Sequence, residues 1–305
     1  MLDISKVLSG KIGISNHERI FIPHNGYILE SVFKHILHHD TVKNEKGDIL
    51  ELYLKNILVS FFGKANVFHN LFPKISYGQG EQDFIVLHGE YTISIECKNH
   101  NFHSLDYYND AISEITKLKR RFEDSVISGC KQAERVRKKI ETQKAVFYFE
   151  NDKKSQRRSK PAIDLNGRDL NKFIKIVVTM DDYVNTAEQF QQYVDNFDRK
   201  YSNTYVVNLF SLQKILWASQ SVEEFIEYVQ FRTRNKIIKS VESSELGHFG
   251  WYKNSLSSIL DNTRDFGVTV NLKNSFTNLF AGYELESMEI SIEKWIEDYK
   301  MSKGE

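Results

Sequence analysis

Cysteine and proline are scarce in this chain of 305 residues, which contains two cysteines and three prolines. Two cysteines cannot form the disulfide framework of a small secreted domain, and three prolines exclude a Pro-rich linker. Long apolar runs are missing too: no stretch approaches the roughly 18 residues that span a membrane. Residues 1–21 contain no apolar core of signal-peptide length. We therefore expect a cytoplasmic protein with reduced thiols and no membrane segment.

The chain also lacks a net charge, because 41 basic residues balance 41 acidic ones. The balance is uneven along the sequence: residues 117–160 contain 15 Lys and Arg against 6 Asp and Glu, an excess of 9 positive charges. The remaining residues carry an equal negative excess. A basic zone in an otherwise acidic protein is compatible with a polyanionic partner such as nucleic acid.

Apolar residues make up 41% of the chain and aromatic residues 13%, which is typical of a folded globular protein. The pattern predicts a largely buried helix that starts after Gly47 and ends near Gly63. Further helices are expected at 27–38, across 109–143 with a break near Gly129, at 186–197 and at 211–234. Strands are expected at 83–87, 91–98, 145–149, 173–180, 204–210 and 266–272.

This order of elements predicts an α/β fold, with a central mixed β-sheet flanked by helices. The sequence turns polar near residue 235. We therefore expect one domain over residues 1–235, which includes a helical lead-in, and a mostly helical extension of unknown role over residues 236–305.

The stretch "GQGEQDFIVLHGEYTISIECKNH" (78–100) carries charged residues within two β-rich segments. Its halves are joined by "HGE", which predicts a hairpin. Because side chains alternate along a strand, Glu96 and Lys98 share a face with Thr92 and Ser94, and the intervening residues face the core. The hairpin brings Asp83 beside Glu96.

Two adjacent carboxylates repel each other unless a cation or a proton lies between them. Mg²⁺ accepts a few carboxylate oxygens and keeps open positions for water or phosphate oxygens. A neighbouring lysine supplies positive charge for an attacking water or for the transition state. The alternative for Glu96 and Lys98 is a solvated ion pair on one strand, which contributes little. Glu81 shares a strand face with Asp83 and is a rival acid.

The segments "DFIVL" (83–87) and "ISIECK" (93–98) resemble the PD-(D/E)xK nuclease superfamily, which has the restriction-endonuclease-like fold. Its signature is an acid on one strand, a hairpin, and then [D/E]-x-K on the next strand. The proline that the family often carries before its first acid is replaced here by Gln82. The catalytic resemblance covers residues 45–100. A looser one continues through "CKQAERV", "FIKIVVTMDD" and "NLFSLQKIL…FIEYVQFR", and it does not extend to residues 240–305.

This resemblance implies that Asp83 and Glu96 bind Mg²⁺, for which Mn²⁺ can substitute, with the Cys97 backbone carbonyl as a third ligand. It implies that Lys98 orients or activates the attacking water. A glutamate on the upstream helix is frequent in the family, and Glu51 in "GDILELYL" is at a suitable position. The alternative for Glu51 is a charge near a helix N-terminus, favoured by the helix dipole.

The helix "KQAERVRKKIE" (131–141) supplies candidate nucleic-acid contacts. Lys131, Arg135, Lys138 and Lys139 share roughly one helix face, which predicts either a phosphate-binding surface or a solvated face. Gln132 is at a position where some family members carry a glutamine near the active site. Weaker candidates are a zinc site at Cys97, His100 and His103, and the histidines 35, 38 and 39, which we expect at a polar helix end.

The expected function is a Mg²⁺-dependent DNA endonuclease in prokaryotic restriction or phage defence; the biological setting depends on family analogy alone. A repair or recombination nuclease and a non-catalytic nucleic-acid-binding protein with the same fold are the alternatives. DNA is the expected partner, with no membrane association. A homodimer or a partner protein of a defence system is also open.

Overall fold

The computed structural model describes residues 14–16, 19–21, 46–77, 80–99, 120, 122–149, 160–180, 201, 203–234 and 245–255. Its centre is a seven-stranded mixed sheet with the order β7-β6-β3-β4-β5-β8-β9. The strands are β3 (Val67–Pro73), β4 (Gln82–His88), β5 (Tyr91–Lys98), β6 (Val146–Phe149), β7 (Ile163–Asp164), β8 (Phe173–Thr179) and β9 (Thr204–Asn208). Strands β5, β8 and β9 are parallel, and the remaining neighbours are antiparallel. The expected α/β class with a mixed sheet is confirmed.

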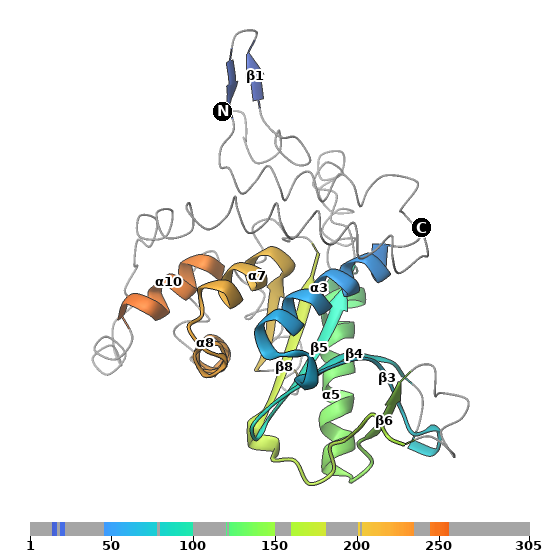
Figure 1. Ribbon diagram of the computed structural model, residues 1–305. Helices are drawn as coiled ribbons and strands as arrows, with labels where there is room; N and C mark the ends of the chain where they lie inside the picture. Colours follow the sequence, from blue (N-terminus) through green and yellow to red (C-terminus); the bar gives the residue numbers. More distant parts are fainter. Residues whose placement is uncertain are drawn as a thin grey trace.

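Helices cover both faces of the sheet (Figure 1). They are α3 (Lys46–Phe62), α5 (Ser128–Glu141), α7 (Leu209–Ala218), α8 (Val222–Arg234) and α10 (Glu245–Ser255). The larger core lies between the sheet and α3, α7, α8 and α10. Two smaller apolar clusters lie under α5 on the opposite face. A separate two-stranded sheet joins β1 (Ile14–Asn16) to β2 (Arg19–Phe21). Single 3-10 turns lie at Lys64–Asn66, Ile75–Tyr77 and Leu170–Lys172.

Helix α3 ends where the sequence predicts but starts at Lys46, two residues before the expected start after Gly47. It is buried on most sides because apolar residues occupy several of its faces. The expected hairpin is present as β4 and β5, which pair from His88 and Tyr91 to Phe84 and Ile95. Gly89 opens the two-residue turn with φ +54°, in the left-handed region that glycine adopts without strain. Strand β8 is buried along its whole length, which explains why its sequence is apolar apart from Lys175 and Thr179.

The sequence did not predict strands β3 and β7. Strand β3 alternates poorly because its first four residues are half-buried and its last three are buried. The run "VFHNLF" between Gly63 and Pro73 was nevertheless a usable signal, since it is rich in strand-forming residues and bounded by turn formers.

The expected break near Gly129 is wrong. A π-helical turn at Glu123–Ile127 leads directly into α5, and Gly129 lies inside the helix. The glycine is needed for close packing: an added Cβ would lie 2.9 Å from Cγ1 of Val177 and 3.2 Å from Cε of Lys98. Sequence reasoning took a packing glycine for a helix breaker.

Helix α10 packs into the larger core through Phe249 and Tyr252. The boundary expected near residue 235 lies outside the described residues, as do the helices expected at 27–38 and 186–197 and the strand expected at 266–272. None of the helices within the described ranges is long and apolar enough to cross a membrane.

Candidate active site

The regular backbone pairing of β4 with β5 ends next to the acidic residues Asp83 and Glu96. Phe84 and Ile95 form the last backbone pair of the ladder, and the same register places Asp83 opposite Glu96. Beyond this pair, side chains replace ladder bonds: Oδ2 of Asp83 accepts a 2.7 Å hydrogen bond from the Cys97 N–H. The Asp83 carboxylate is thus fixed against the neighbouring strand.

Gln82, which stands where the resembling family often has proline, helps to hold this opening. Its Nε2 donates hydrogen bonds to the carbonyl oxygens of Phe84 at 3.2 Å and Ile95 at 3.1 Å. The side chain is buried, so these bonds satisfy backbone oxygens that water does not reach. Gln82 therefore has a structural role that the sequence did not indicate.

Glu96 and Lys98 form an ion pair that is buried. Nζ of Lys98 lies 3.3 Å from Oε2 of Glu96, and the side chains are 14% and 0% exposed. The alternative of a solvated strand edge is therefore wrong for Glu96. Its other oxygen, Oε1, is buried and has no hydrogen-bond partner among the described residues. An unsatisfied carboxylate oxygen is costly, which suggests that the site is built to bind a further group.

Burial and the charge of a neighbouring acid make both carboxyl groups hard to ionise. Burial raises the pKa of Asp83, although the Lys98 charge and the Cys97 N–H oppose the shift. Burial also raises the pKa of Glu96 well above its usual value, and the Asp83 charge raises it further. A cation between the two groups would reverse this penalty.

Glu51 approaches the same region from α3 and is partly exposed. Its charge raises the pKa of Asp83, so the two carboxylates are within electrostatic reach. Oε2 of Glu51 lies 3.4 Å from Nε2 of His69 on β3. The His69 ring stacks on Phe84 with the ring centroids 4.6 Å apart. His69 was missed because strand β3, which carries it, was not predicted.

Helix α5 covers the site from the face of the sheet opposite to α3. The Lys98 side chain passes against Gly129, where a Cβ would lie 3.2 Å from its Cε. Gln132 lies one helical turn further along α5 and is half-buried; its Oε1 has no hydrogen-bond partner in the described ranges. Arg135 follows after another turn and packs on Gly80 at the entry to β4. Its charge lowers the pKa of Glu96.

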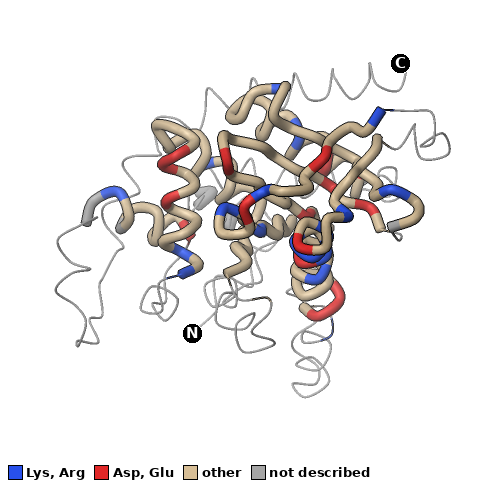
Figure 2. The backbone as a smooth tube through the Cα atoms, turned by 90° about the horizontal axis from the view of Figure 1, so that it is seen from below, with Lys and Arg blue, Asp and Glu red and all other residues tan. Residues whose placement is uncertain are grey.

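The basic residues of α5 differ in their exposure to solvent. Lys131, Arg135 and Lys138 are exposed, and Lys139 is half-buried. Burial, with the Arg135 charge, lowers the pKa of Lys139. The helix carries five basic and two acidic residues in all, and Figure 2 marks them along the backbone.

One acid of α5 anchors the helix instead of facing solvent. Glu134 is buried and binds Nζ of Lys175 on β8 at 3.0 Å, and it also accepts a hydrogen bond from Arg137 at 3.3 Å. This buried pair links α5 to β8. Sequence reasoning did not find it, since Lys175 stands within an apolar strand.

The donor set fits a hard divalent cation with few protein ligands. In the part of the chain that the structure describes, no group of three or more His, Cys, Asp and Glu side chains is arranged to hold a metal. Asp83 and Glu96 lie opposite each other in the β4–β5 register, and Oε1 of Glu96 is unsatisfied among the described residues. Mg²⁺ accepts such a set because it keeps several water ligands. The Cys97 carbonyl as a third ligand stays a prediction.

The remaining candidates are placed as follows. Glu81 is exposed and precedes β4, so it does not share the burial of Asp83. The Cys97 thiol faces the larger core. The histidines at 35, 38, 39, 100 and 103 lie outside the described residues.

Comparison of the chain with models of known protein families, with curated proteins and with solved structures gives no match.

Proposed function

We propose that this protein is a metal-dependent nuclease that hydrolyses phosphodiester bonds in DNA. The observation that carries the proposal is the buried pair Asp83 and Glu96, held opposite each other where β4 and β5 separate, with Lys98 bound to Glu96. The restriction-endonuclease-like fold is part of this proposal. The mixed sheet, with α3 on one face and α5 on the other, supports it.

Each residue has a role in the proposed reaction. Asp83 and Glu96 would hold Mg²⁺ or Mn²⁺, with the Cys97 carbonyl completing the protein ligands. When bound, the cation would act as a Lewis acid and lower the pKa of a water. Lys98 would orient the attacking water and offset the negative charge that develops on the phosphate. Glu51, held by His69, would position a second water. In-line attack leaves a 5′-phosphate and a 3′-hydroxyl.

Helix α5 would hold the substrate beside this site. Its outer residues Lys131, Arg135, Lys138 and Lys139 would contact phosphates, and Gln132 would face the reacting strand. We place the activity in restriction or phage defence in the cytoplasm of a prokaryote, with a homodimer or a defence partner still open. Repair or recombination cleavage, and DNA binding without catalysis, are the alternatives.

The test is cleavage of plasmid, linear duplex and single-stranded DNA by the purified chain, with Mg²⁺, Mn²⁺ or EDTA. We expect cleavage with either cation and none in EDTA. Asp83→Asn and Glu96→Gln should each lose it by at least about 100-fold, because each removes a charged ligand. Lys98→Ala should lose most of the rate but keep Mn²⁺ binding by calorimetry, because the ammonium group is not a ligand.

Glu81→Gln is the matched control, since it removes an exposed acid two residues from Asp83. Near wild-type cleavage by Asp83→Asn would show that the active site is misassigned. DNA binding by the wild-type chain without cleavage under any cation would instead favour the non-catalytic alternative.

A further inference from the structure

The pairing of strand β3 with β4 is interrupted at Asn70. Val67–His69 and Leu71 pair with β4, while Leu71–Pro73 pair with β6. The β3–β4 register is the same on both sides of this point, because His69 pairs with Phe84 and Leu71 with Gln82. That register places Asn70 directly opposite Asp83. Asp83 therefore lies between Asn70 on β3 and Glu96 on β5.

The backbone of Asn70 is left-handed, with φ +52°. Most residues with a side chain are strained in this conformation, and asparagine is among those that tolerate it. A kink that needs asparagine would therefore explain the residue without any function. Backbone outliers of this kind also cluster at functional sites, so a second observation is needed to decide.

The second observation is the side-chain oxygen of Asn70. Oδ1 is buried and has no hydrogen-bond partner among the residues that the structure describes. A kink residue gains nothing from burying an unsatisfied acceptor, because the acceptor loses its hydrogen bonds to water without replacing them. Oε1 of Glu96 is likewise buried and has no hydrogen-bond partner among the described residues. Unsatisfied oxygens thus stand on both strands that flank Asp83.

We infer that Asn70 is a third side-chain ligand of the cation held by Asp83 and Glu96, through its Oδ1. This inference rests on the cation site of the proposed function. An amide oxygen is a suitable ligand for a hard divalent cation, and it adds no negative charge to two carboxylates that already repel each other. The left-handed backbone at position 70 orients this amide, so the strain serves the site.

The deciding variant is Asn70→Gly in the full chain, because glycine keeps the left-handed backbone and removes only the amide. In EDTA, its melting temperature should stay within a few degrees of the wild type. Calorimetric titration with Mn²⁺ should show affinity lowered by roughly tenfold, the effect of losing one group of a metal site. Asn70→Ala is the opposite control: it removes the amide and also strains the backbone, so it should melt lower as well.

Asn70→Asp is the second variant and keeps a ligand oxygen. It should bind Mn²⁺ more tightly than the wild type and melt lower in EDTA, because a third carboxylate adds repulsion. Unchanged Mn²⁺ affinity in Asn70→Gly or in Asn70→Asp, with binding lost in Asp83→Asn, would overturn the role of Asn70 and leave the Asp83–Glu96 site standing. No Mn²⁺ binding by the wild type would overturn both.

Discussion

At the scale of single residues, the site is defined by acids that the fold buries at a cost. Asp83 and Glu96 have raised pKa values because burial opposes their ionisation, and a neighbouring acid adds to it: Glu51 for Asp83, and Asp83 for Glu96. An acid whose pKa is raised in the folded state favours folding least at high pH. The stability that it retains at low pH is lost as the pH rises through the folded-state pKa.

We therefore predict that the metal-free protein becomes less stable as the pH rises from about 4 toward 8, and that Glu96→Gln reduces this loss. At pH 8 in EDTA, Glu96→Gln should be more stable than the wild type by about 1–3 kcal/mol. The difference should shrink toward low pH, because protonation of the acids removes the penalty for burying their charges. Urea unfolding across the pH series, with and without Mn²⁺, measures it.

A saturating cation should remove the advantage of the variant, since the wild type then ionises its acids without penalty. Glu81→Gln serves again as the control and should show no such pH dependence. An advantage of Glu96→Gln that grew toward low pH would contradict the assigned repulsion.

A second residue-scale feature is the glycine beneath Lys98. Replacing glycine by alanine inside a helix normally stabilises it by about 1 kcal/mol. At Gly129 the added Cβ would lie 2.9 Å from Val177 and 3.2 Å from the Lys98 stem. We predict that Gly129→Ala instead destabilises the protein by about 1–3 kcal/mol and slows cleavage, because the side chain overpacks the contact and displaces Lys98.

The matched control is Gly47→Ala in α3, where a Cβ would meet nothing within 4 Å. That variant should be neutral or stabilising in urea unfolding and should cleave DNA normally. Equal stability changes in the two variants would mean that the close approach at Gly129 does not constrain α5.

At the scale of elements, α5 joins the site to the surface. Its buried face packs on the sheet and is anchored by Glu134 and Lys175, and its outer face carries the basic residues. We predict that Lys131→Ala with Arg135→Ala weakens binding to all duplex sequences about equally. Each lost phosphate contact should flatten the slope of log affinity against log salt by about 0.9.

Fluorescence anisotropy in Ca²⁺ across a salt series measures this slope. Lys55→Ala with Lys64→Ala is the control, because these lysines lie on and just after α3 and their loss changes the net charge equally. A solvated α5 face predicts that both double variants behave alike. Base preference should change little in either, since phosphate contacts position the DNA without specifying its sequence.

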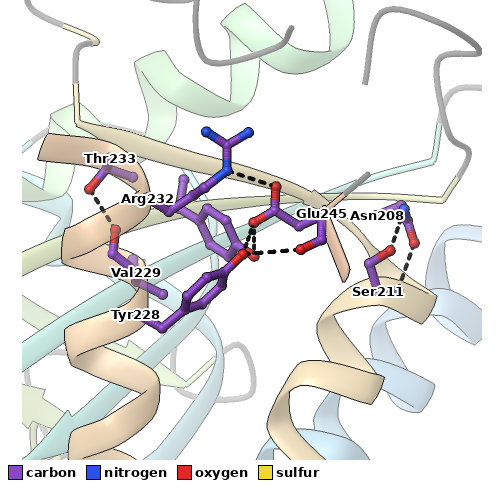
Figure 3. A network of polar contacts seen from close by, with 8 residues as sticks. Asn208, Ser211, Tyr228, Val229, Arg232, Thr233 and Glu245 are labelled. Atoms are coloured by element: carbon purple, nitrogen blue, oxygen red, sulfur yellow. Dashed lines mark hydrogen bonds and ion pairs between the residues drawn. The ribbon is translucent and has the colours of Figure 1, made fainter. Parts of the chain in front are cut away.

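At the scale of the whole molecule, a buried polar cluster fastens α10 to the rest of the fold (Figure 3). The Glu245 carboxylate accepts hydrogen bonds from Nε of Arg232 at 3.0 Å and from the hydroxyl groups of Tyr205 and Tyr228. Burial raises the pKa of Glu245, but the charges of Arg232 and His248 and the two tyrosine hydroxyl groups together hold the pKa below the usual value. The cluster connects β9, α8 and α10.

We predict that Glu245→Ala lowers the free energy of unfolding by about 3–5 kcal/mol, because Arg232 is 3% exposed and would be left as an unpaired buried charge. Urea unfolding provides the measurement, and Glu90→Ala in the exposed β4–β5 turn is the control. A loss no larger than that of the control would mean that α10 is not held through Glu245.

The local sequence pattern was sufficient to predict several elements of this protein. Alternation along residues 83–98 predicted the hairpin, the pairing of Asp83 with Glu96 and the orientation of Cys97 toward the core, because neighbouring strands joined by a short turn have a determined register. Apolar runs predicted α3 and β8 in the same way, since each buries its own sequence on nearly every side.

Tertiary structure decided what covers the polar face of the hairpin. The alternation shows that Glu96 and Lys98 share a face, but not that α5 buries it, that Gly129 admits Lys98, or that Lys175 is paired with Glu134. His69 and Asn70 join the site only through pairing with β4, a contact between separate segments. Such contacts depend on which elements pack together, and the apolar periodicity of one segment shows its buried face but not the segment that covers it.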